Sequence, residues 1–90
     1  MAAYAKEKDN LLKRLRRIEG QVRGIQRMIE QDKYCVDILV QIAAARSALD
    51  RVGLMLLESH MRGCVTRAIK NDDGEAAVTE LTEVVRQFIR

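Results

Sequence analysis

Three side chains in this sequence have the chemistry of metal ligands: Cys35, His60 and Cys64. They comprise both cysteines and the one histidine of the 90-residue chain. His60 and Cys64 are four residues apart, so on an α-helix they lie on one face, within reach of a single ion. Two thiolates and an imidazole form a soft ligand set, which suits Cu(I) in a trigonal site or Zn(II) with a fourth ligand. Because the chain has no further cysteine or histidine, the set favours Cu(I).

The third residue of the set, Cys35, precedes His60 by 25 residues. The stretch between them has no proline, and small or apolar residues recur in steps of three and four, which predicts one long helix. On such a helix about 37 Å separates Cys35 from His60, whereas a metal–ligand bond is about 2–2.3 Å long. If all three side chains bind one ion, Cys35 must therefore come from a second copy of the chain. An antiparallel homodimer with a two-fold axis would hold two equivalent sites.

Plainer interpretations of the same residues exist. Free cysteine is often a small buried apolar residue, so the trio could be incidental. His60 and Cys64 could also be the base and the nucleophile of an enzyme. No orienting third group and no glycine-rich loop accompanies them, so we expect no catalytic residues and no enzymatic activity.

Three helices are predicted to carry these residues, over about 6–31, 33–70 and 74–89. Asp32 is the expected N-cap of the second helix, and Asp73 or Gly74 is expected to begin the third. The chain is thus expected to be all-α: one domain over residues 1–90, folded as a three-helix protomer that forms an antiparallel helical-bundle dimer. The first helix carries a heptad of apolar residues at Leu11, Leu15, Ile18, Val22, Ile25 and Ile29.

The composition indicates in which cellular compartment the protein is found. No run of about 18 apolar residues is present, and the start of the chain lacks the apolar core of a secretory signal. We therefore expect a cytoplasmic protein with no membrane partner. Cysteines in that compartment are reduced by default, so Cys35 and Cys64 are expected to be ligands or reactive thiols rather than a disulfide.

The distribution of charge suggests a polyanionic partner. Residues 6–27 hold eight lysines and arginines against three acidic residues, whereas the rest of the chain is mildly acidic. Nucleic acid is the first candidate. No short recognition helix follows a tight turn, so we expect a helix face to meet the DNA, although such a face could also be merely solvated. The basic face of the first helix comprises Lys13, Arg14, Arg16, Arg17, Arg23 and Arg27, and Arg46 and Arg51 of the second helix are candidates to join it. The residues expected to contact DNA are Lys13, Arg14, Arg16, Arg17 and Arg51.

Two longer motifs carry a family resemblance. The run RLRRIEGQVRGIQRMIEQDKYCVDILVQIAAARSAL, together with HMRGC from His60 to Cys64, resembles the CsoR family of copper-sensing bacterial repressors, over nearly the whole chain. The resemblance implies antiparallel dimers that pair into a homotetramer. It implies that the metal-free protein binds operator DNA and that Cu(I) releases it, so that copper-export genes are expressed. The family's Cu(I) ligands correspond to Cys35, His60 and Cys64.

The resemblance also separates the branches of the family. Nickel and cobalt sensors resemble this chain but carry histidine in place of Cys64, formaldehyde sensors lack the second cysteine, and persulfide sensors lack the histidine. The chain is thus similar to the copper branch. By the same resemblance, Tyr34 and Glu80 form an outer shell that communicates with the free nitrogen of His60, and Arg14 and Arg51 contact DNA.

Two alternatives stay open at this point. The chain could be a thiol, persulfide or other metal sensor of the same family. It could also be a metal-stabilised helical scaffold that binds no DNA.

Overall fold

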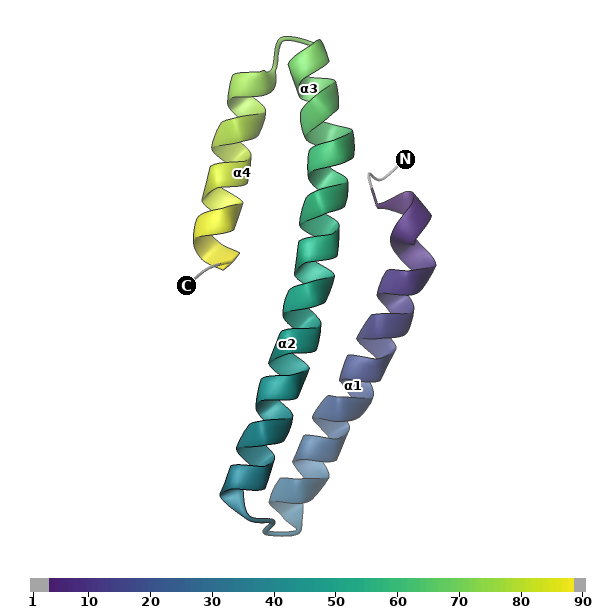
Figure 1. The fold of residues 1–90 in the computed structure, drawn as a ribbon, viewed down its shortest axis with the longest axis vertical. Helices are drawn as coiled ribbons and strands as arrows, with labels where there is room; N and C mark the ends of the chain where they lie inside the picture. Colours follow the sequence, from purple (N-terminus) through teal and green to yellow (C-terminus); the bar gives the residue numbers. More distant parts are fainter. Residues whose placement is uncertain (1–3, 89–90) are drawn as a thin grey trace. The chain divides into compact units, whose positions relative to one another are not determined.

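The structure is a computed structural model that describes residues 4–88, and every regular element among them is helical. The all-α prediction is therefore confirmed. The segments η2 and α3 follow α2 without a break, so the helices form three runs separated by two turns (Figure 1). The elements are a short 3₁₀ helix η1 (Ala5–Glu7), α1 (Lys8–Glu30), α2 (Cys35–His60), a π-helical segment η2 (Met61–Val65), α3 (Thr66–Lys70) and α4 (Gly74–Phe88).

The chain divides into two compact units, each of which is described by itself. The N-terminal unit is Lys6–Met55 and holds α1 and most of α2. The C-terminal unit holds residues 56–88, together with residues 4–5. The expectation that residues 1–90 form one domain stays a prediction.

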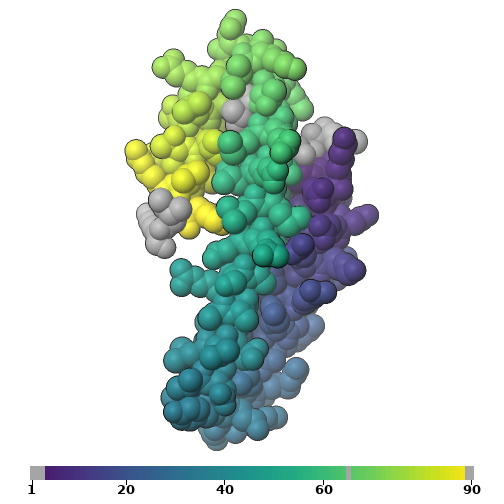
Figure 2. Space-filling model, viewed as in Figure 1, coloured from purple at the N-terminus to yellow at the C-terminus, as the bar shows by residue number. Residues whose placement is uncertain are grey.

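The core of the N-terminal unit lies between α1 and α2, which run side by side there (Figures 1 and 2). Leu11 and Ile18 of α1 are buried against Val52 of α2, with Ala48 and Met55 packed around them. These positions are spaced by three, four and seven residues, as expected for helices that pack along one face.

Only part of the predicted heptad of α1 is buried within the chain. Leu11 and Ile18 are buried, whereas Leu15, Val22 and Ile29 remain 39%, 46% and 58% exposed. The two sets form neighbouring rows on the helix, and a single partner helix covers one row. The second row of apolar side chains therefore faces solvent in a single chain.

Both turns between the helical runs are built around an aspartate with left-handed backbone geometry. Asp32 has a φ of 54° and Asp72 a φ of 62°. After α1, the N–H of Asp32 donates to the carbonyl of Ile29 and the N–H of Lys33 to that of Met28. The N–H groups of residues 72 and 73 make the same two bonds to residues 69 and 68. Each turn is thus a Schellman motif in which aspartate occupies the position that glycine usually takes.

This geometry corrects the predicted cap of the second helix. Asp32 belongs to the end of α1, because its N–H closes that helix. The carbonyl of Tyr34 accepts the first bonds of α2, from the N–H groups of Asp37 and Ile38, so Tyr34 is the N-cap. At the next turn, the carbonyl of Asp73 accepts the N–H of Ala77, and α4 begins at Gly74 as expected.

The helix predicted over 33–70 begins at Cys35 and is interrupted by the π-helical segment η2. The N–H of Thr66 is shared between the carbonyls of Met61, five residues back, and Gly63, three residues back, where an α-helix would use a residue four back. Gly63 lies within this segment and has low helix propensity, so the wider turn costs less there than in the rest of the helix. The predicted end of the third helix, residue 89, lies outside the described residues.

The C-terminal unit is a helical hairpin in which α4 packs against α3 and η2. Gly74 allows the close approach at the turn, because a Cβ there would lie 3.2 Å from Cγ1 of Ile69. Within the described part of the chain, we find no helix with the length and apolar content needed to cross a lipid bilayer.

Candidate metal centre

Two of the three predicted ligands share a hollow in the C-terminal unit. The hollow has a volume of about 200 Å³ and is bounded by the helical run that contains His60 and by α4. His60 is the last residue of α2 and Cys64 lies in η2, and both side chains are half-buried. Glu80 of α4, an exposed residue, also lines the hollow, so a cysteine, a histidine and a glutamate border one space.

Small residues leave the room for this hollow. Ala68 of α3 and Ala76 and Ala77 of α4 line it, together with Asp73 at the turn. The Schellman turn at residues 71–73 reverses the chain, so α4 runs back beside α3 and η2 (Figure 1). Methyl side chains at these three positions let the helices approach without filling the space in front of His60 and Cys64.

Cys35 and Tyr34 lie in the N-terminal unit and are not among the residues that line the hollow. Cys35 is the first residue of α2 and is exposed, and Tyr34 is 67% exposed. Among the described residues of one chain, no three cysteine, histidine, aspartate or glutamate side chains are grouped closely enough to hold a metal ion. The structure therefore brings together His60, Cys64 and Glu80, but not the complete set predicted from the sequence.

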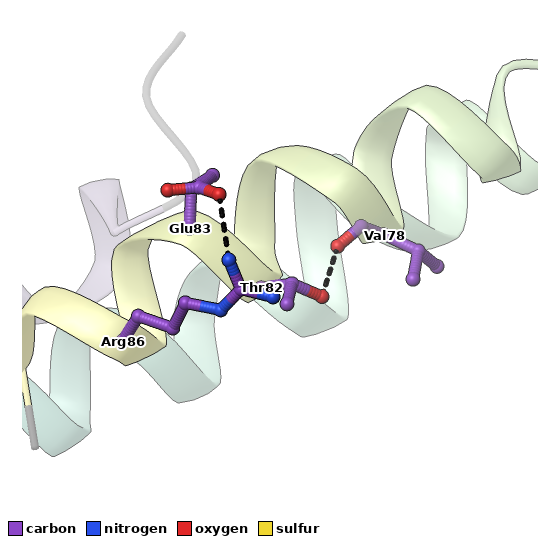
Figure 3. Close-up of polar contacts among 4 residues, drawn as sticks. All are labelled: Val78, Thr82, Glu83 and Arg86. Carbon is purple, nitrogen blue, oxygen red and sulfur yellow. Dashed lines mark hydrogen bonds and ion pairs between the residues drawn. The ribbon is translucent and has the colours of Figure 1, made fainter.

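The basic face predicted for DNA lies in the N-terminal unit. Lys13, Arg16, Arg17 and Arg51 are exposed there. Arg14 is half-buried, and its Nε atom is buried with no hydrogen-bond partner. The ion pairs found among the described residues join Glu19 to Arg23, Glu58 to Arg62 and Glu83 to Arg86, the last of which is drawn in Figure 3.

These ion pairs leave the predicted face with most of its charge available. None of the three involves Lys13, Arg14, Arg16, Arg17 or Arg51. Arg23, another member of the face, is partly compensated by Glu19 at 3.3 Å. The assignment of this face to DNA stays a prediction.

Several features of the hollow were missed by sequence reasoning. Asp73 and the three alanines line it, and η2 carries Cys64. The spacing of four from His60 to Cys64 to Ala68 was a signal that these residues share a face. Asp73 was expected only as the start of a helix.

Comparison with known proteins places this chain in a family. Residues 7–87 match the family model described as "metal-sensitive transcriptional repressor". This match covers most of the chain and includes the hollow, η2 and the basic face.

The chain belongs to the family of metal-sensitive transcriptional repressors.

Among the relatives of this repressor, the copper-sensing transcriptional repressor CsoR of Bacillus subtilis is 57% identical over 86 residues, which are 96% of this chain and 85% of the relative. The copper-sensing transcriptional repressor RicR of Mycobacterium tuberculosis is 58% identical over 87 residues, 97% of this chain and 90% of the relative. The resemblance stated from the sequence is thus confirmed. These relatives are named as repressors and not as enzymes.

A solved structure agrees with the fold. The crystal structure of the copper-sensing repressor CsoR with Cu(I) from Geobacillus thermodenitrificans matches this repressor with a TM-score of 0.90 at 51% identity. The match covers 96% of this chain and 90% of the other. The helical architecture described above is therefore that of the family.

Proposed function

We propose that this repressor responds to copper(I): a metal-free tetramer binds operator DNA, and Cu(I) binding at an intersubunit site of Cys35, His60 and Cys64 releases it and derepresses copper-export genes. The observation that carries the proposal is the placement of His60 and Cys64 in one hollow. The relatives named for copper sensing, at 57% and 58% identity, support the choice of metal.

The donor chemistry in the hollow fits Cu(I). A thiolate and an imidazole are soft to borderline donors, and Cu(I) favours such ligands at low coordination number. The missing thiolate is that of Cys35, which begins α2 while His60 ends it. Because a continuous helix holds its first and last residues apart, the partner's copy of this cysteine has to complete the set. Cu(I), when bound, supplies the bonds that tie the two chains together at this point.

Exposed apolar side chains support self-association. On α1 the uncovered row is Leu15, Val22 and Ile29, and large apolar side chains of α2 are also open to solvent. Contiguous apolar surface of this kind is rarely left uncovered in a monomer and marks an interface. We propose that these rows form the antiparallel dimer and the dimer of dimers. The residues of α2 in question are Val36, Leu39, Val40, Ile42 and Leu49.

The exposed basic face supports DNA binding. Lys13, Arg16, Arg17 and Arg51 have no ion-pair partner among the described residues, so their charge is available to phosphates. A tetramer would present this face four times. A repressor acts where the DNA is, and we therefore propose that the protein works in the cytoplasm.

The coupling between metal and DNA is proposed to run through Glu80. Glu80 lines the same hollow as His60, and its carboxylate is proposed to accept a hydrogen bond from the imidazole nitrogen that does not face the metal. Tyr34 of the partner subunit would join this contact, since it directly precedes Cys35. Cu(I) lowers DNA affinity only if it binds the DNA-incompetent shape more tightly.

The test uses a duplex selected from a random-sequence pool by the metal-free protein. Titration of this duplex, with and without one equivalent of Cu(I) per chain, should show a loss of affinity of about 5- to 150-fold. The variant His60→Ala should keep part of its Cu(I) binding through the two thiolates. It should lose most of the release of DNA by Cu(I).

The same titration separates the alternatives. Release by Ni(II), Zn(II) or a persulfide donor but not by Cu(I) would indicate another sensor of the family. If no duplex is selected at all, the protein is a helical scaffold and the proposal is wrong.

A further inference from the structure

A single residue, Thr66, closes the wide turn that contains Cys64. Its backbone N–H is shared between the carbonyls of Met61 and Gly63, and its side-chain Oγ1 donates to the Met61 carbonyl at 3.1 Å. The two bonds to Met61 span five residues, one more than the bonds of an α-helix. Two donors of one residue thus hold η2 in its π-helical form.

The other two threonines of the chain provide a contrast. Thr79 donates to the carbonyl of Glu75 at 3.1 Å, and Thr82 to that of Val78 at 2.7 Å, as Figure 3 shows for Thr82. These bonds span four residues, which is the usual bond of a helical threonine to the preceding turn. Thr66 reaches one residue farther, so its hydroxyl bond is specific to the wide turn.

The wide turn has a consequence for the hollow. His60, Cys64 and Ala68 follow one another in steps of four, and all three line the hollow. On an α-helix, with about 3.6 residues per turn, each step of four rotates a side chain by about 40°, so the first and third would differ by about 80°. In the wider π-helical turn of η2, each residue rotates by less around the helix axis. This smaller rotation cancels most of the difference in direction between the first and third side chains, so all three lie on one face.

We infer that Thr66 is a positioning residue for the metal centre: its hydroxyl bond to the Met61 carbonyl holds η2 in the π-helical register that presents Cys64 beside His60. The inference rests on the proposed function, in which these two side chains bind Cu(I). Without the hydroxyl, η2 relaxes toward α-helical bonding, which rotates Cys64 by about 40° relative to His60: the two side chains stay on one face but are less well aligned on one ion. Frequent occurrence of π-helical turns at functional sites agrees with such a role.

The experiment compares Thr66→Val with Thr66→Ser, which keeps the hydroxyl, and with Thr82→Val, which removes an ordinary threonine bond from α4. Cu(I) affinity is measured by competition with a chromophoric chelator, and the thiolate-to-copper absorption is recorded. We expect Thr66→Val to bind Cu(I) about 5- to 10-fold more weakly, as the loss of one hydrogen bond would give. Its thiolate-to-copper absorption should fall, and Thr66→Ser and Thr82→Val should behave as the unsubstituted protein does.

A second readout uses the metal-free protein. Amide hydrogen exchange of the N–H of residue 66 should be faster in Thr66→Val than in the unsubstituted protein. It should be unchanged in Thr82→Val, because only the substitution at residue 66 loosens η2. Valine has nearly the shape of threonine and residue 66 is exposed, so the variant should fold. Equal urea midpoints for the two valine variants would show that global stability is not the cause.

Three results would overturn the inference: unchanged affinity and exchange in Thr66→Val, an equal loss in Thr82→Val, or no rescue in Thr66→Ser. Cys64→Ala, measured in parallel, separates this from failure of the proposed function. If Cys64→Ala binds Cu(I) as tightly as the unsubstituted protein, the proposed function and the inference both fail. If Cys64→Ala loses Cu(I) but Thr66→Val does not, only the inference fails.

Discussion

His60 and Cys64 line one hollow, although His60 ends α2 and Cys64 lies in the π-helical turn that follows. Glu80 lines the same hollow from α4. A single chain thus brings together two of the three proposed ligands and a neighbouring hydrogen-bond acceptor. The third proposed ligand, Cys35, begins the same helix that His60 ends.

This division predicts complementation between two inactive variants. Cys35→Ala keeps the half-site of His60 and Cys64, and a double variant with His60→Ala and Cys64→Ala keeps Cys35. Each alone should lose tight Cu(I) binding. Co-refolded in equal amounts, they should recover roughly a quarter of the unsubstituted sites, because about half of the dimers are mixed and each mixed dimer has one complete site of two. Stoichiometric Cu(I) titration measures the recovery.

The control for complementation is each variant co-refolded with itself, which should stay inactive. A site formed within one chain could not be restored by mixing, so an absence of recovery would contradict the intersubunit arrangement. Mass spectrometry of the intact assembly would verify that mixed dimers have formed.

Glu80 is predicted to act in the Cu(I)-induced release of DNA and not in the binding of Cu(I) itself. Glu80→Gln should keep Cu(I) affinity nearly unchanged, because the carboxylate is not among the proposed ligands. It should lose most of the coupling of about 1–3 kcal/mol that is typical between two linked sites, since an amide is a weaker acceptor for the imidazole N–H. Fluorescence anisotropy of a labelled operator duplex, with and without Cu(I), measures the coupling.

The matched control for Glu80 lies on the same helix. Glu83 pairs with Arg86 at 3.1 Å and does not line the hollow, so Glu83→Gln should release DNA as the unsubstituted protein does (Figure 3). Equal loss of release in the two variants would indicate a general effect of charge on α4 and would argue against the contact with His60.

Much of the fold could be predicted because helical periodicity is a property of the sequence alone. Leu11 and Ile18 repeat with the period of a helix and are buried as expected. The helix caps were harder to predict, because aspartate at residue 32 suits both the N-cap of a helix and the left-handed position that follows a helix. Which role it takes depends on the length of the turn, and the short turn made it the residue that closes α1.

The candidate site could be predicted only in part, for a similar reason. Spacing alone placed His60 and Cys64 on one face. The insertion of a residue at η2 depends on a side-chain bond from Thr66 to the Met61 carbonyl, and threonine at that position is equally compatible with an ordinary helix. Glu80 is distant in sequence, and its place in the hollow follows from the turn and from the alanines on the facing helices.

The basic face predicts a specific dependence on salt. Arg17 is exposed and takes part in none of the ion pairs among the described residues. Arg17→Ala should therefore weaken DNA binding. It should also reduce the steepness of the plot of log affinity against log salt concentration by about 1 for each phosphate that the guanidinium neutralises. Arg86→Ala removes a charge already paired with Glu83 and should leave the slope unchanged. Binding measured at several salt concentrations tests both, and equal slopes for the two variants would contradict the assignment of the face.

The left-handed backbone of Asp32 predicts that substitutions at this position change the free energy of unfolding in opposite directions, depending on whether the new residue tolerates a positive φ. With φ at 54°, a Cβ is strained, and alanine lacks the short polar side chain that eases the strain in aspartate. Asp32→Ala should therefore lower the free energy of unfolding by about 1 kcal/mol, whereas Asp32→Gly should raise it by about 0.5–1 kcal/mol. Urea unfolding of the metal-free protein at one fixed concentration measures both, because assembly makes the midpoint depend on concentration.

The control for Asp32 is an aspartate in the interior of a helix. Asp50 is an exposed residue of α2, and Asp50→Ala should leave stability unchanged or raise it by up to about 0.7 kcal/mol, because alanine has the higher helix propensity. The same chemical change is thus expected to lower stability at residue 32 but not at residue 50. Asp72, with φ at 62°, should follow Asp32, and a stabilising effect of alanine at either turn would contradict the strain argument.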